Sequence, residues 1–403
     1  MTEISLDQAR PFILDIQGLR TTTPCTSVSS VAKRIHNIQI DTISVVSRSH
    51  NLITFNRYLD YKDGKIWDYE REGELFEHWS HALCLMPMET YPFYKWRLQY
   101  YEDQLWSSYK KWGLKNRDFI EEVYLYVKEN GPVKSSEYGT REKSGEGWWD
   151  WKAEKTAMEY LFYMGKLMVA YREGFQKAYD IAERVIPSSI YDRKLTDEAA
   201  EEFLIDTVLG CLGLASYKDF RSYVGKIPAR KLWGTRQAQI EKHLEKFVES
   251  DYIVKVKIEG LDTSYYCLSE NIYKLEKADS GSFENTPIKI LTPFDNILRE
   301  RHYPEEIWNF DYKIECYVPK KKRIYGYFVL PILDGCNLVG RLDAKVHRDK
   351  GLLEVKNLYF EDGLNVDSEF KHRVFEGLRQ FMTFHSCTDI SLPAIHNFND
   401  LEF

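Results

Sequence analysis

The sequence predicts an α+β protein with tandem winged helix-turn-helix modules and a C-terminal domain built on a small antiparallel β-sheet or barrel. Two observations predict this class. The order helix, short helix, longer helix and hairpin occurs twice between residues 116 and 278, and strand-like segments dominate the chain after residue 286. A chain of 403 residues also has room for roughly two to three domains of average size.

Four segments are expected from this pattern. An N-terminal helical or winged-helix domain covers residues 1–115, winged modules cover 116–190 and 191–278, and a barrel-like domain with a closing helix covers 286–403. The first segment is rich in aromatic residues and has helices over 6–16 and 28–35. Gln39-Ile40-Asp41 lies between the second of these helices and a third.

The first repeat begins with a helix over 117–129, which Gly131-Pro132 stops. Ser135 or Ser136 is a candidate cap for a short second helix, and a third helix over 148–164 ends at Gly165. A hairpin over 166–171 and 175–179 completes the predicted module.

The second repeat has a helix over 197–212, a short helix capped by Ser216, a helix over 235–249, and a hairpin over 252–258 and 264–268. The stretch 218–242 is locally basic, because it contains seven basic residues and two acidic ones, Asp219 and Glu241. Its basic residues are Lys218, Arg221, Lys226, Arg230, Lys231, Arg236 and Lys242. They predict either a patch that contacts phosphate or an ordinary solvated helix surface.

After a linker at 279–287, strands are expected over 312–318, 325–333, 337–346 and 352–360, followed by a helix over 368–384. The turn after the first strand reads Lys320-Lys321-Lys322-Arg323. Such a basic loop suits phosphate contact, although charged tips also keep sheet edges soluble.

Composition narrows the function. The formal charge of -7 argues against a protein that coats nucleic acid through a global positive field, so any DNA surface is expected to be local.

No apolar run approaches the roughly 20 residues of a membrane span, and the N-terminus lacks the layout of a signal peptide, so a cytoplasmic location without membrane contact is expected. The seven cysteines are dispersed without a C-x-x-C pair, and the common nucleotide, zinc and hydrolase motifs are absent. No metal or organic cofactor is expected, and the protein is expected to be a monomer.

Several segments carry a more specific signal. They are Gln39 to His50 (QIDTISVVSRSH), 75–82 (LFEHWSHA), 85–87 (LMP), 147–152 (GWWDWK), 161–170, 291–296 (LTPFDN), 312–315 (YKIE) with Pro319, 325–327 (YGY), 330–331 (LP) and 340–341 (GR). In this order they resemble the YcaQ/AlkZ family of crosslink-repair DNA glycosylases over nearly the whole chain. The resemblance implies a monofunctional enzyme that releases N7-alkylated guanine and unhooks interstrand crosslinks in double-stranded DNA, with winged helices shaping a channel for the duplex. Members with Q-x-D tend toward broad N7-alkylpurine substrates.

The chemistry of releasing N7-alkylated guanine suits the Q-x-D motif, Gln39-Ile40-Asp41. An N7-alkylated guanine is cationic and leaves without prior protonation, so the transition state concentrates positive charge on the sugar. Such a reaction needs an anion near the anomeric carbon and a held water. Asp41 is the expected catalytic anion, Gln39 would orient the water, and Ile40 would point into the core. The alternative is that Asp41 is a helix N-cap or forms an Asx turn ahead of Ser44.

Other candidates are less specific. Glu77, His78 and His81, expected at the start of an aromatic helix, would line the site or clamp phosphate, or be buried and structural. Trp148, Trp149 and Trp151 beside Lys152 suggest a stacking platform, although aromatic residues at helical spacing more often belong to a core. The expected DNA contacts are Arg48, His50, Lys152, Arg230, Lys231, Arg236, Lys320, Lys321, Lys322 and Arg323.

Two further alternatives concern the motif and the class. Gln237-Ala238-Gln239 has the Q-x-Q form that some family members use, but it lies in a predicted helix of the second module and is interpreted as a surface pair. The competing class is a non-enzymatic winged-helix transcriptional regulator, which would bind DNA and be indifferent to Asp41→Asn.

Overall fold

The computed structural model describes residues 2–98, 107–138, 150–226, 233–279, 281–283 and 285–392. Its contacts group the chain into two compact units. The first comprises Met1–Gly64, Asp206–Phe220 and Glu241–Phe403, and the second comprises Lys65–Ile205 and Arg221–Ile240. The division into four domains stays a prediction.

The first unit begins with a short strand and three helices. They are β1 (Thr2–Ile4), α1 (Leu6–Ile16), α2 (Val28–Ile35) and α3 (Ser49–Phe55), with the two-residue strand β2 (Ile38–Gln39) before α3. Ser5 and Gln8 form a capping box on α1, and Ser27 and Ser30 form one on α2, so side chains satisfy the free N–H groups at both starts. Both helices have the predicted bounds.

A four-stranded sheet in this unit has the order β1-β9-β10-β8. The hairpin of β9 (Ile253–Ile258) and β10 (Ser264–Leu268) forms its centre, β8 (Ala215–Ser216) pairs antiparallel with β10, and β1 pairs parallel with β9. The hairpin was predicted from the sequence, whereas the parallel pairing of the N-terminal strand was not.

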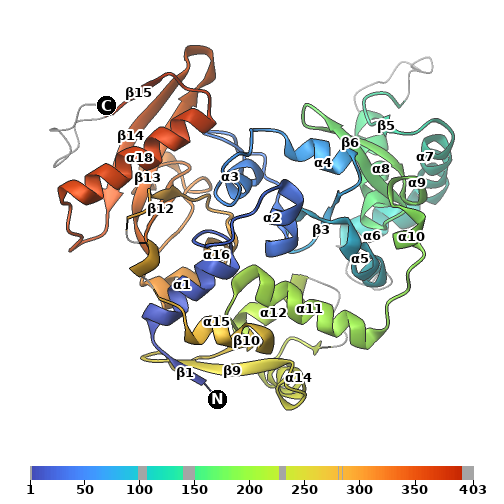
Figure 1. Cartoon of the computed structure of the whole chain (residues 1–403). Helices are drawn as coiled ribbons and strands as arrows, with labels where there is room; N and C mark the ends of the chain where they lie inside the picture. Colours follow the sequence, from blue (N-terminus) through green and yellow to red (C-terminus); the bar gives the residue numbers. More distant parts are fainter. Residues whose placement is uncertain are drawn as a thin grey trace. The chain divides into compact units, whose positions relative to one another are not determined.

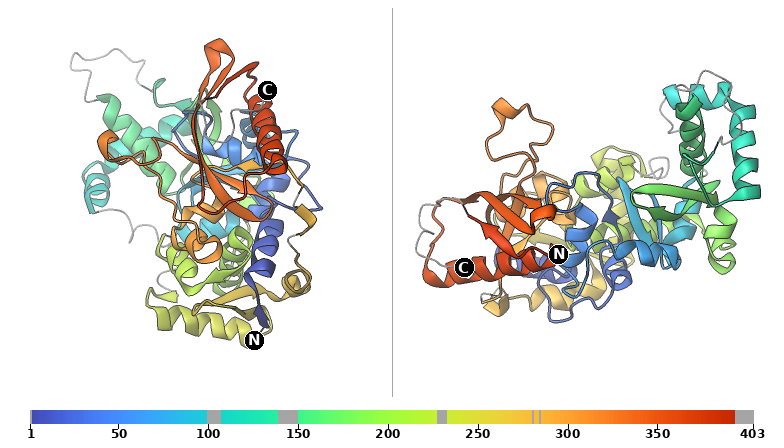
Figure 2. Two further views of the ribbon diagram at one scale, coloured as in Figure 1. Left: turned by 90° about the vertical axis from the view of Figure 1, so that its left-hand side faces the viewer. Right: turned by 90° about the horizontal axis from the view of Figure 1, so that it is seen from above.

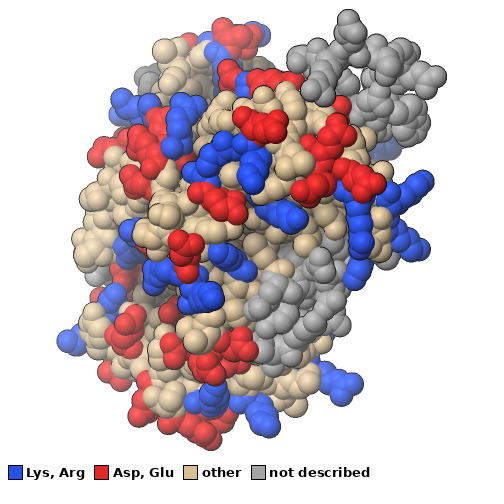
Figure 3. Space-filling view, turned by 90° about the vertical axis from the view of Figure 1, so that its right-hand side faces the viewer, with Lys and Arg blue, Asp and Glu red and all other residues tan. Residues whose placement is uncertain are grey.

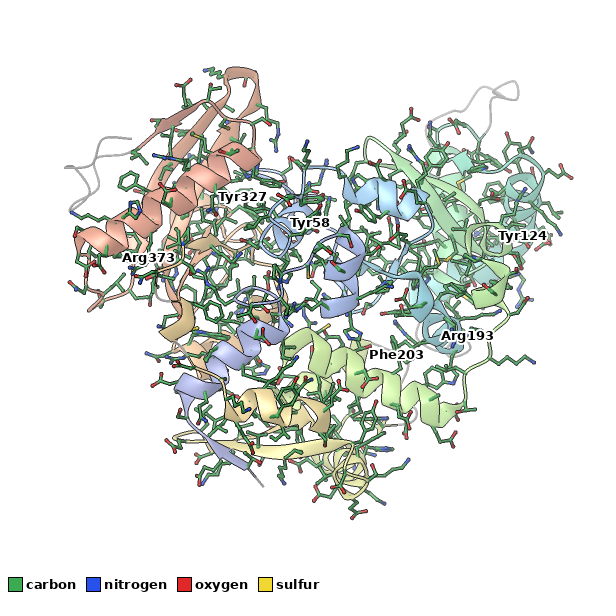
Figure 4. All side chains as sticks on the ribbon, in the orientation of Figure 1. Tyr58, Tyr124, Arg193, Phe203, Tyr327 and Arg373 are labelled. Carbon is green, nitrogen blue, oxygen red and sulfur yellow. The ribbon has the colours of Figure 1, made fainter. Side chains whose placement is uncertain are left out.

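The C-terminal part of the first unit is a five-stranded curled sheet. Its order is β11 (Lys289–Ile290), β12 (Leu330–Asp334), β13 (Asn337–His347), β14 (Leu352–Phe360) and β15 (Asp389–Ser391). Register shifts at Ile332/Leu333 and Asp343/Ala344 bend the strands. Helix α18 (Ser368–Phe384) lies along the sheet (Figure 1), and Gly377 allows its close approach, because a Cβ there would meet Cγ1 of Ile288 at 2.3 Å. Arg373 of α18 also pairs with Asp334 at 2.8 Å (Figure 4).

The strand expected over 312–318 is wrong, and so is the early start of the next strand at residue 325. Residues 311–329 contain no strand, and β12 begins at Leu330. The reason is local. The carboxylate of Glu315 accepts hydrogen bonds from the N–H groups of Ile324, Tyr325 and Gly326 at 2.9 to 3.1 Å, so a side chain satisfies donors that a strand partner would otherwise take.

The second unit opens with α4 (Ile66–Arg71) and an antiparallel hairpin of β3 (Leu75–Trp79) and β4 (Leu83–Pro87). The helix expected to start near Trp79 is therefore a strand. The helices α5 (Tyr91–Leu98), α6 (Ser107–Lys115), α7 (Arg117–Asn130) and α8 (Asp150–Tyr163) follow. A three-stranded sheet has the order β5 (Val133–Lys134), β7 (Gln176–Ile181) and β6 (Leu167–Glu173).

The two predicted repeats share one order of elements. In each, a helix leads to a two-residue strand that pairs antiparallel with the second strand of a later hairpin: β5 with β7, and β8 with β10. The second repeat contains α11 (Asp197–Leu212), α12 (Tyr217–Lys226) and α14 (Gln237–Glu249). The short helix expected in the first repeat is a turn over 135–138, and residues 139–149 lie outside the described chain. The winged-helix interpretation stays a prediction.

Apolar packing matches the predicted helical faces. Val123 and Val127 of α7 are fully buried against Leu161 and Phe162 of α8 and against the strands β6 and β7. Burial of this stripe explains why the helices begin and end close to the predicted positions. In the described part of the chain, no helix combines the length and apolar character needed to cross a bilayer.

Candidate active site

The Q-x-D motif lies in the first unit, in an extended segment between α2 and α3. His36, at the end of α2, has a left-handed backbone conformation (φ 60°) that turns the chain into β2. Ile40 is 7% exposed and packs in the core, while Gln39 and Asp41 are half-buried. Because side chains alternate in an extended segment, the buried isoleucine directs its two polar neighbours to the other side. This is the local arrangement that the sequence predicted.

The carboxylate of Asp41 is largely withdrawn from water. Burial raises the pKa of Asp41 above its ordinary value, and nearby donors and a cation oppose that rise. They are the backbone N–H groups of Ile43 and Thr42, the hydroxyl of Ser49, and the charge of Arg48. The Oδ2 atom is buried and has no hydrogen-bond partner among the described residues.

The two structural roles expected for Asp41 have different outcomes. The N-cap ahead of Ser44 is absent, because α3 begins at Ser49 with Arg48 as its N-cap. The Asx turn ahead of Ser44 stays a prediction.

The first residue of α3 contacts a residue from the C-terminal half of the chain. Ser49 and Thr292 are fully buried, and their side-chain oxygens lie 2.7 Å apart. Three residues after Thr292, the carboxylate of Asp295 forms a bidentate ion pair with Arg57 at 2.8 and 2.9 Å, and both side chains are fully buried. The segment 291–295 therefore contacts the chain at the start of α3 and just after its end.

Arg48 and His50, expected to contact DNA, have different environments. Arg48 is half-buried; burial raises the pKa of the carboxyl groups of both Asp41 and Asp63, and the charge of Arg48 partly opposes that rise. His50 is 0% exposed, so the expected DNA contact of this residue is wrong. It is the second residue of a seven-residue helix that is buried throughout, which leaves its ring no route to a nucleic acid surface.

The loop before β12 also lies close to Asp41. The charge of Asp41 contributes to raising the pKa of the Cys316 thiol, after burial, and that of the Tyr317 hydroxyl, after the charge of Cys316 and burial. Tyr317 is 83% exposed and Ile324 is 75% exposed. Figure 2 shows this segment projecting from the sheet that follows it.

The predicted basic tip is a single 3-10 turn of this loop. Lys320, Lys321 and Lys322 form the turn and are exposed. Arg323 is half-buried, donates to the carbonyl of Val318 at 2.8 Å, and stacks over the ring of Tyr327, which Figure 4 labels. The loop thus combines three exposed lysines with exposed apolar and aromatic side chains.

Glu77, His78 and His81 belong to the second unit. Glu77 is 0% exposed and binds Arg172 at 2.7 and 2.8 Å and Lys177 at 2.9 Å. Burial opposes ionisation of Glu77, but these two cations hold its pKa below the ordinary value. The geometry of Glu77 is therefore that of a buried, satisfied ion pair.

The two histidines also have specific neighbours. His78 is 2% exposed, its Nε2 lies 3.0 Å from the carbonyl oxygen of Phe162, and burial lowers its pKa to about 4. The buried, structural alternative describes His78. His81 is half-buried with its ring 5.9 Å from that of Tyr223.

The remaining predicted residues are exposed or outside the described part. Arg236 is exposed just before α14, and Gln237 and Gln239 are exposed in its first turn, which confirms that the second Q-x-Q sequence lies on a surface. Trp148, Trp149, Arg230 and Lys231 lie outside the described residues, as do the side chains of Trp151 and Lys152. Among the residues that the structure describes, no group of three or more His, Cys, Asp or Glu side chains could hold a metal ion.

Sequence reasoning assigned no role to Ser49 or Thr292. Both stand inside segments that carry the family resemblance, but 243 positions separate them, and no local pattern indicates that they touch. Their small hydroxyl side chains are common in turns and helix starts, so residue type alone gave no signal.

Comparisons with known proteins identify the family and the fold. The family model of AlkZ-like DNA glycosylases matches residues 32–380. The solved structure of Streptomyces sahachiroi DNA glycosylase AlkZ superposes with a TM-score of 0.67 at 16% sequence identity, covering 97% of this chain and 100% of that chain. At this identity the structural match shows a shared fold, while the family match covers most of the chain, including the Q-x-D motif and the loop before β12. This chain therefore belongs to the AlkZ-like family of DNA glycosylases.

Proposed function

We propose that this glycosylase hydrolyses the N-glycosidic bond of N7-alkylated guanine in duplex DNA and unhooks interstrand crosslinks, with Asp41 and Gln39 at its catalytic centre. The observation that carries the proposal is the environment of Asp41. Its carboxylate is largely withdrawn from water, the nearby Arg48 favours its ionised form, and its Oδ2 atom is buried with no hydrogen-bond partner among the described residues.

The reaction needs little from a general acid. The bond between C1′ of the sugar and N9 of the cationic guanine breaks, and its electron pair neutralises the departing base. Positive charge then develops on the sugar, where the Asp41 anion stabilises it. A water molecule oriented by the Gln39 amide adds to C1′, and its proton passes to the Asp41 carboxylate.

Partial burial suits both tasks of Asp41. A carboxylate with few water contacts interacts more strongly with a nearby cation, because less solvent screens the charge. The raised pKa also makes Asp41 a better proton acceptor than an exposed aspartate, while the donors around it favour the ionised form.

The loop over residues 316–327 is the proposed DNA contact beside the site. Lys320, Lys321 and Lys322 would neutralise phosphates, which supplies affinity without sequence preference. Arg48 is better placed to support Asp41 than to serve as an exposed phosphate ligand. Arg236 is exposed and stays a candidate contact, as do Lys152, Arg230 and Lys231.

The test uses a duplex with a single N7-methylguanine, analysed on gels before and after alkali treatment. Wild-type protein should create abasic sites that break only after alkali, which identifies a monofunctional glycosylase. Asp41→Asn should lower the excision rate by roughly 10²-fold or more, on the scale seen when one preorganised catalytic group is removed. Binding to undamaged duplex should survive this change.

A matched control is Asp362→Asn, which removes an exposed carboxylate from the same unit and should leave excision unchanged. Strand breaks before alkali would contradict the monofunctional mechanism. Full excision by Asp41→Asn would contradict the role of the carboxylate. If no variant releases the base although all bind DNA, N7-methylguanine is not a substrate.

A further inference from the structure

We propose that Glu315 is a positioning residue of the DNA contact, which holds the loop before β12 (residues 316–327) in a preformed shape so that its lysine turn meets phosphate without first being ordered. The inference rests on the proposed DNA contact of this loop and names the residue that shapes it. Glu315 is negatively charged and 7% exposed, so it acts on the conformation of the loop and is not itself a phosphate ligand.

The Glu315 carboxylate closes the loop at its neck. Its Oε1 accepts from the N–H of Ile324 at 2.9 Å, and its Oε2 accepts from the N–H groups of Ile324, Tyr325 and Gly326 at 3.1, 2.9 and 3.0 Å. Burial opposes ionisation of Glu315, but these N–H groups and the charge of Arg323 hold its pKa below the ordinary value. One anion therefore joins the two ends of the loop through charge-assisted hydrogen bonds, which are stronger than bonds between neutral groups.

Further hydrogen bonds hold the turn that carries the lysines. The N–H of Lys322 donates to the carbonyl of Pro319 at 2.8 Å, and Nε of Arg323 donates across the loop to the carbonyl of Val318 at 2.8 Å. The N–H of Val318 donates to the carbonyl of Glu315 at 2.9 Å. The turn is thus connected through Val318 to the same residue that closes the neck.

The sheet supplies a fixed base below the neck (Figure 2). Arg341 of β13 lies over the rings of Phe310 at 4.2 Å and Tyr325 at 4.6 Å, one before the loop and one within it. The hydroxyl of Tyr312 donates to the carbonyl of Val329 at 2.6 Å, which joins the chain before the loop to the chain after it. Because the base is fixed, the order of the tip depends on the contacts made at the neck.

A preformed loop binds phosphate more tightly than a mobile loop with the same charges. A mobile loop loses conformational freedom when its lysines reach the duplex, and this loss is subtracted from the binding free energy. A loop that Glu315 has already ordered avoids most of that loss. The number of phosphates neutralised sets the dependence of affinity on salt, and it is the same in both cases. Loss of the carboxylate should therefore lower the affinity and leave the salt slope unchanged.

Glu315→Gln separates this role from simple electrostatics. The change removes a negative charge near three lysines, so charge alone predicts tighter binding. It also places an amide NH2 group among backbone donors, so the positioning role predicts weaker binding. Affinity for undamaged duplex should fall by roughly tenfold at every salt concentration, the scale of one lost hydrogen bond to a charged group. The slope of log affinity against log salt should stay as in the wild type, and fluorescence anisotropy titrations would measure both quantities.

Hydrogen exchange measures the order of the loop without DNA. In the full-length protein, mass spectrometry of the peptide over residues 316–328 should show faster exchange in Glu315→Gln than in the wild type. The reason is that the N–H groups of Ile324, Tyr325 and Gly326 lose their acceptor. Exchange in peptides from β13 and β14 should be unchanged, which would show that the effect is confined to the loop.

Two further variants complete the test. Gly326→Ala changes no charge, but a Cβ there would lie 2.6 Å from Oδ2 of Asp343 on a backbone with φ 149°. It should distort the same neck, speed exchange in the loop and lower the affinity with the slope unchanged. Asp311→Asn is the matched control, because it removes an exposed carboxylate from the chain just before the loop. This control should bind duplex at least as tightly as the wild type and leave exchange in the loop unchanged.

The outcomes separate this inference from the proposed function. Faster exchange in Glu315→Gln, with an affinity equal to that of Asp311→Asn, would overturn the positioning role alone, since order would then not matter for binding. Unchanged exchange would overturn it as well. If changing Lys320, Lys321 and Lys322 to Gln leaves the wild-type salt slope, the proposed DNA contact itself fails, and the positioning role fails with it. If Glu315→Gln does not fold, Gly326→Ala decides by the same criteria.

Discussion

At the scale of single residues, Asp41 balances two opposing effects. Burial raises the pKa of Asp41 and so penalises its charge, while neighbouring backbone N–H groups and the charge of Arg48 favour the ionised form. Full exposure would leave a weaker anion screened by water, and deeper burial without donors would leave a neutral acid at physiological pH. In the proposed reaction, the half-buried position keeps an anion next to the sugar carbon on which positive charge develops.

This balance predicts the acid side of the pH profile. The pKa of Asp41 is raised by burial above the ordinary 3.8, and the proposed mechanism needs the ionised form. The excision rate of the wild-type protein should therefore be constant above the raised pKa and fall as the pH drops through it, with a midpoint above 3.8. Single-turnover rates from about pH 4 to about pH 8, with folding checked by circular dichroism at each pH, would measure the midpoint. A rate that stays flat down to about pH 4 would mean that Asp41 is not the group that limits the reaction.

The burial and contacts of a residue could be predicted where they depend on adjacent residues in the sequence. They could not be predicted where they depend on residues that only the fold brings together. The position of Asp41 beside a buried Ile40 follows from alternation in an extended segment. The contact between Ser49 and Thr292 could not be predicted, because it joins residues 243 positions apart. The prediction for His50 was wrong because the sequence alone does not reveal that both faces of the short helix α3 are covered.

At the scale of elements, the loop before β12 departs most from its prediction. Glu315 takes over donors that would have paired in a strand, so the loop presents Lys320, Lys321 and Lys322 on a turn. The strand propensity of this segment is outweighed by a single carboxylate that accepts several backbone hydrogen bonds. Outside this loop, α1, α2, α11, β14 and α18 have the bounds that the sequence predicted.

The loop makes a prediction about salt dependence. The triple change of Lys320, Lys321 and Lys322 to Gln should weaken binding to undamaged duplex and reduce the slope of log affinity against log salt by up to about 3, since each lysine that neutralises a phosphate adds about one unit to the slope. The matched control is the same change at Lys110, Lys111 and Lys115 on α6 of the other unit. Titrations by fluorescence anisotropy at several salt concentrations would give both slopes. Equal slopes for the two triple variants would refute a specific role for the loop.

The hairpin of β3 and β4 makes a prediction about stability. Arg172→Met would leave the fully buried carboxylate of Glu77 with Lys177 as its remaining ion-pair partner in the described part of the chain. Removing one partner of a buried ion pair typically costs about 3 to 5 kcal/mol, so the melting temperature should fall by several degrees. Excision measured well below the melting temperature should change little if Glu77 is structural. A large loss of activity in a folded Arg172→Met protein would instead favour the catalytic alternative for Glu77.

At the scale of the whole molecule, charge is distributed without one dominant field. The formal charge is -7, and the face drawn in Figure 3 intersperses basic and acidic side chains. We therefore expect DNA affinity to come from local groups, of which the loop lysines are the proposed ones. The sequence predicted the mixed α+β class and most helices and hairpins, since these follow from periodicity. It could not predict the parallel pairings of β1 with β9 and of β14 with β15, because pairing between distant segments leaves no periodic signal.

The proposed substrate makes a prediction about adduct size. A crosslinked guanine is tethered to the opposite strand and cannot be flipped into a closed pocket, so an enzyme that unhooks it should not select strongly by the size of the N7 substituent. Excision of N7-methylguanine and of a bulky N7 adduct should differ by less than roughly tenfold, which corresponds to about 1.4 kcal/mol of discrimination. Parallel single-turnover assays on both duplexes would measure the ratio. Strict preference for methyl would contradict crosslink unhooking.

The contacts of Thr292 with Ser49 and of Asp295 with Arg57 also have a consequence for biosynthesis. The segment with Gln39 and Asp41 leaves the ribosome early, whereas Thr292 is added 243 residues after Ser49. At about 5 to 20 residues per second, the interval is on the order of 10 to 50 s. A nascent chain therefore carries α3 long before the segment that packs against it, and this part of the fold is completed only while the last third of the polypeptide is being translated.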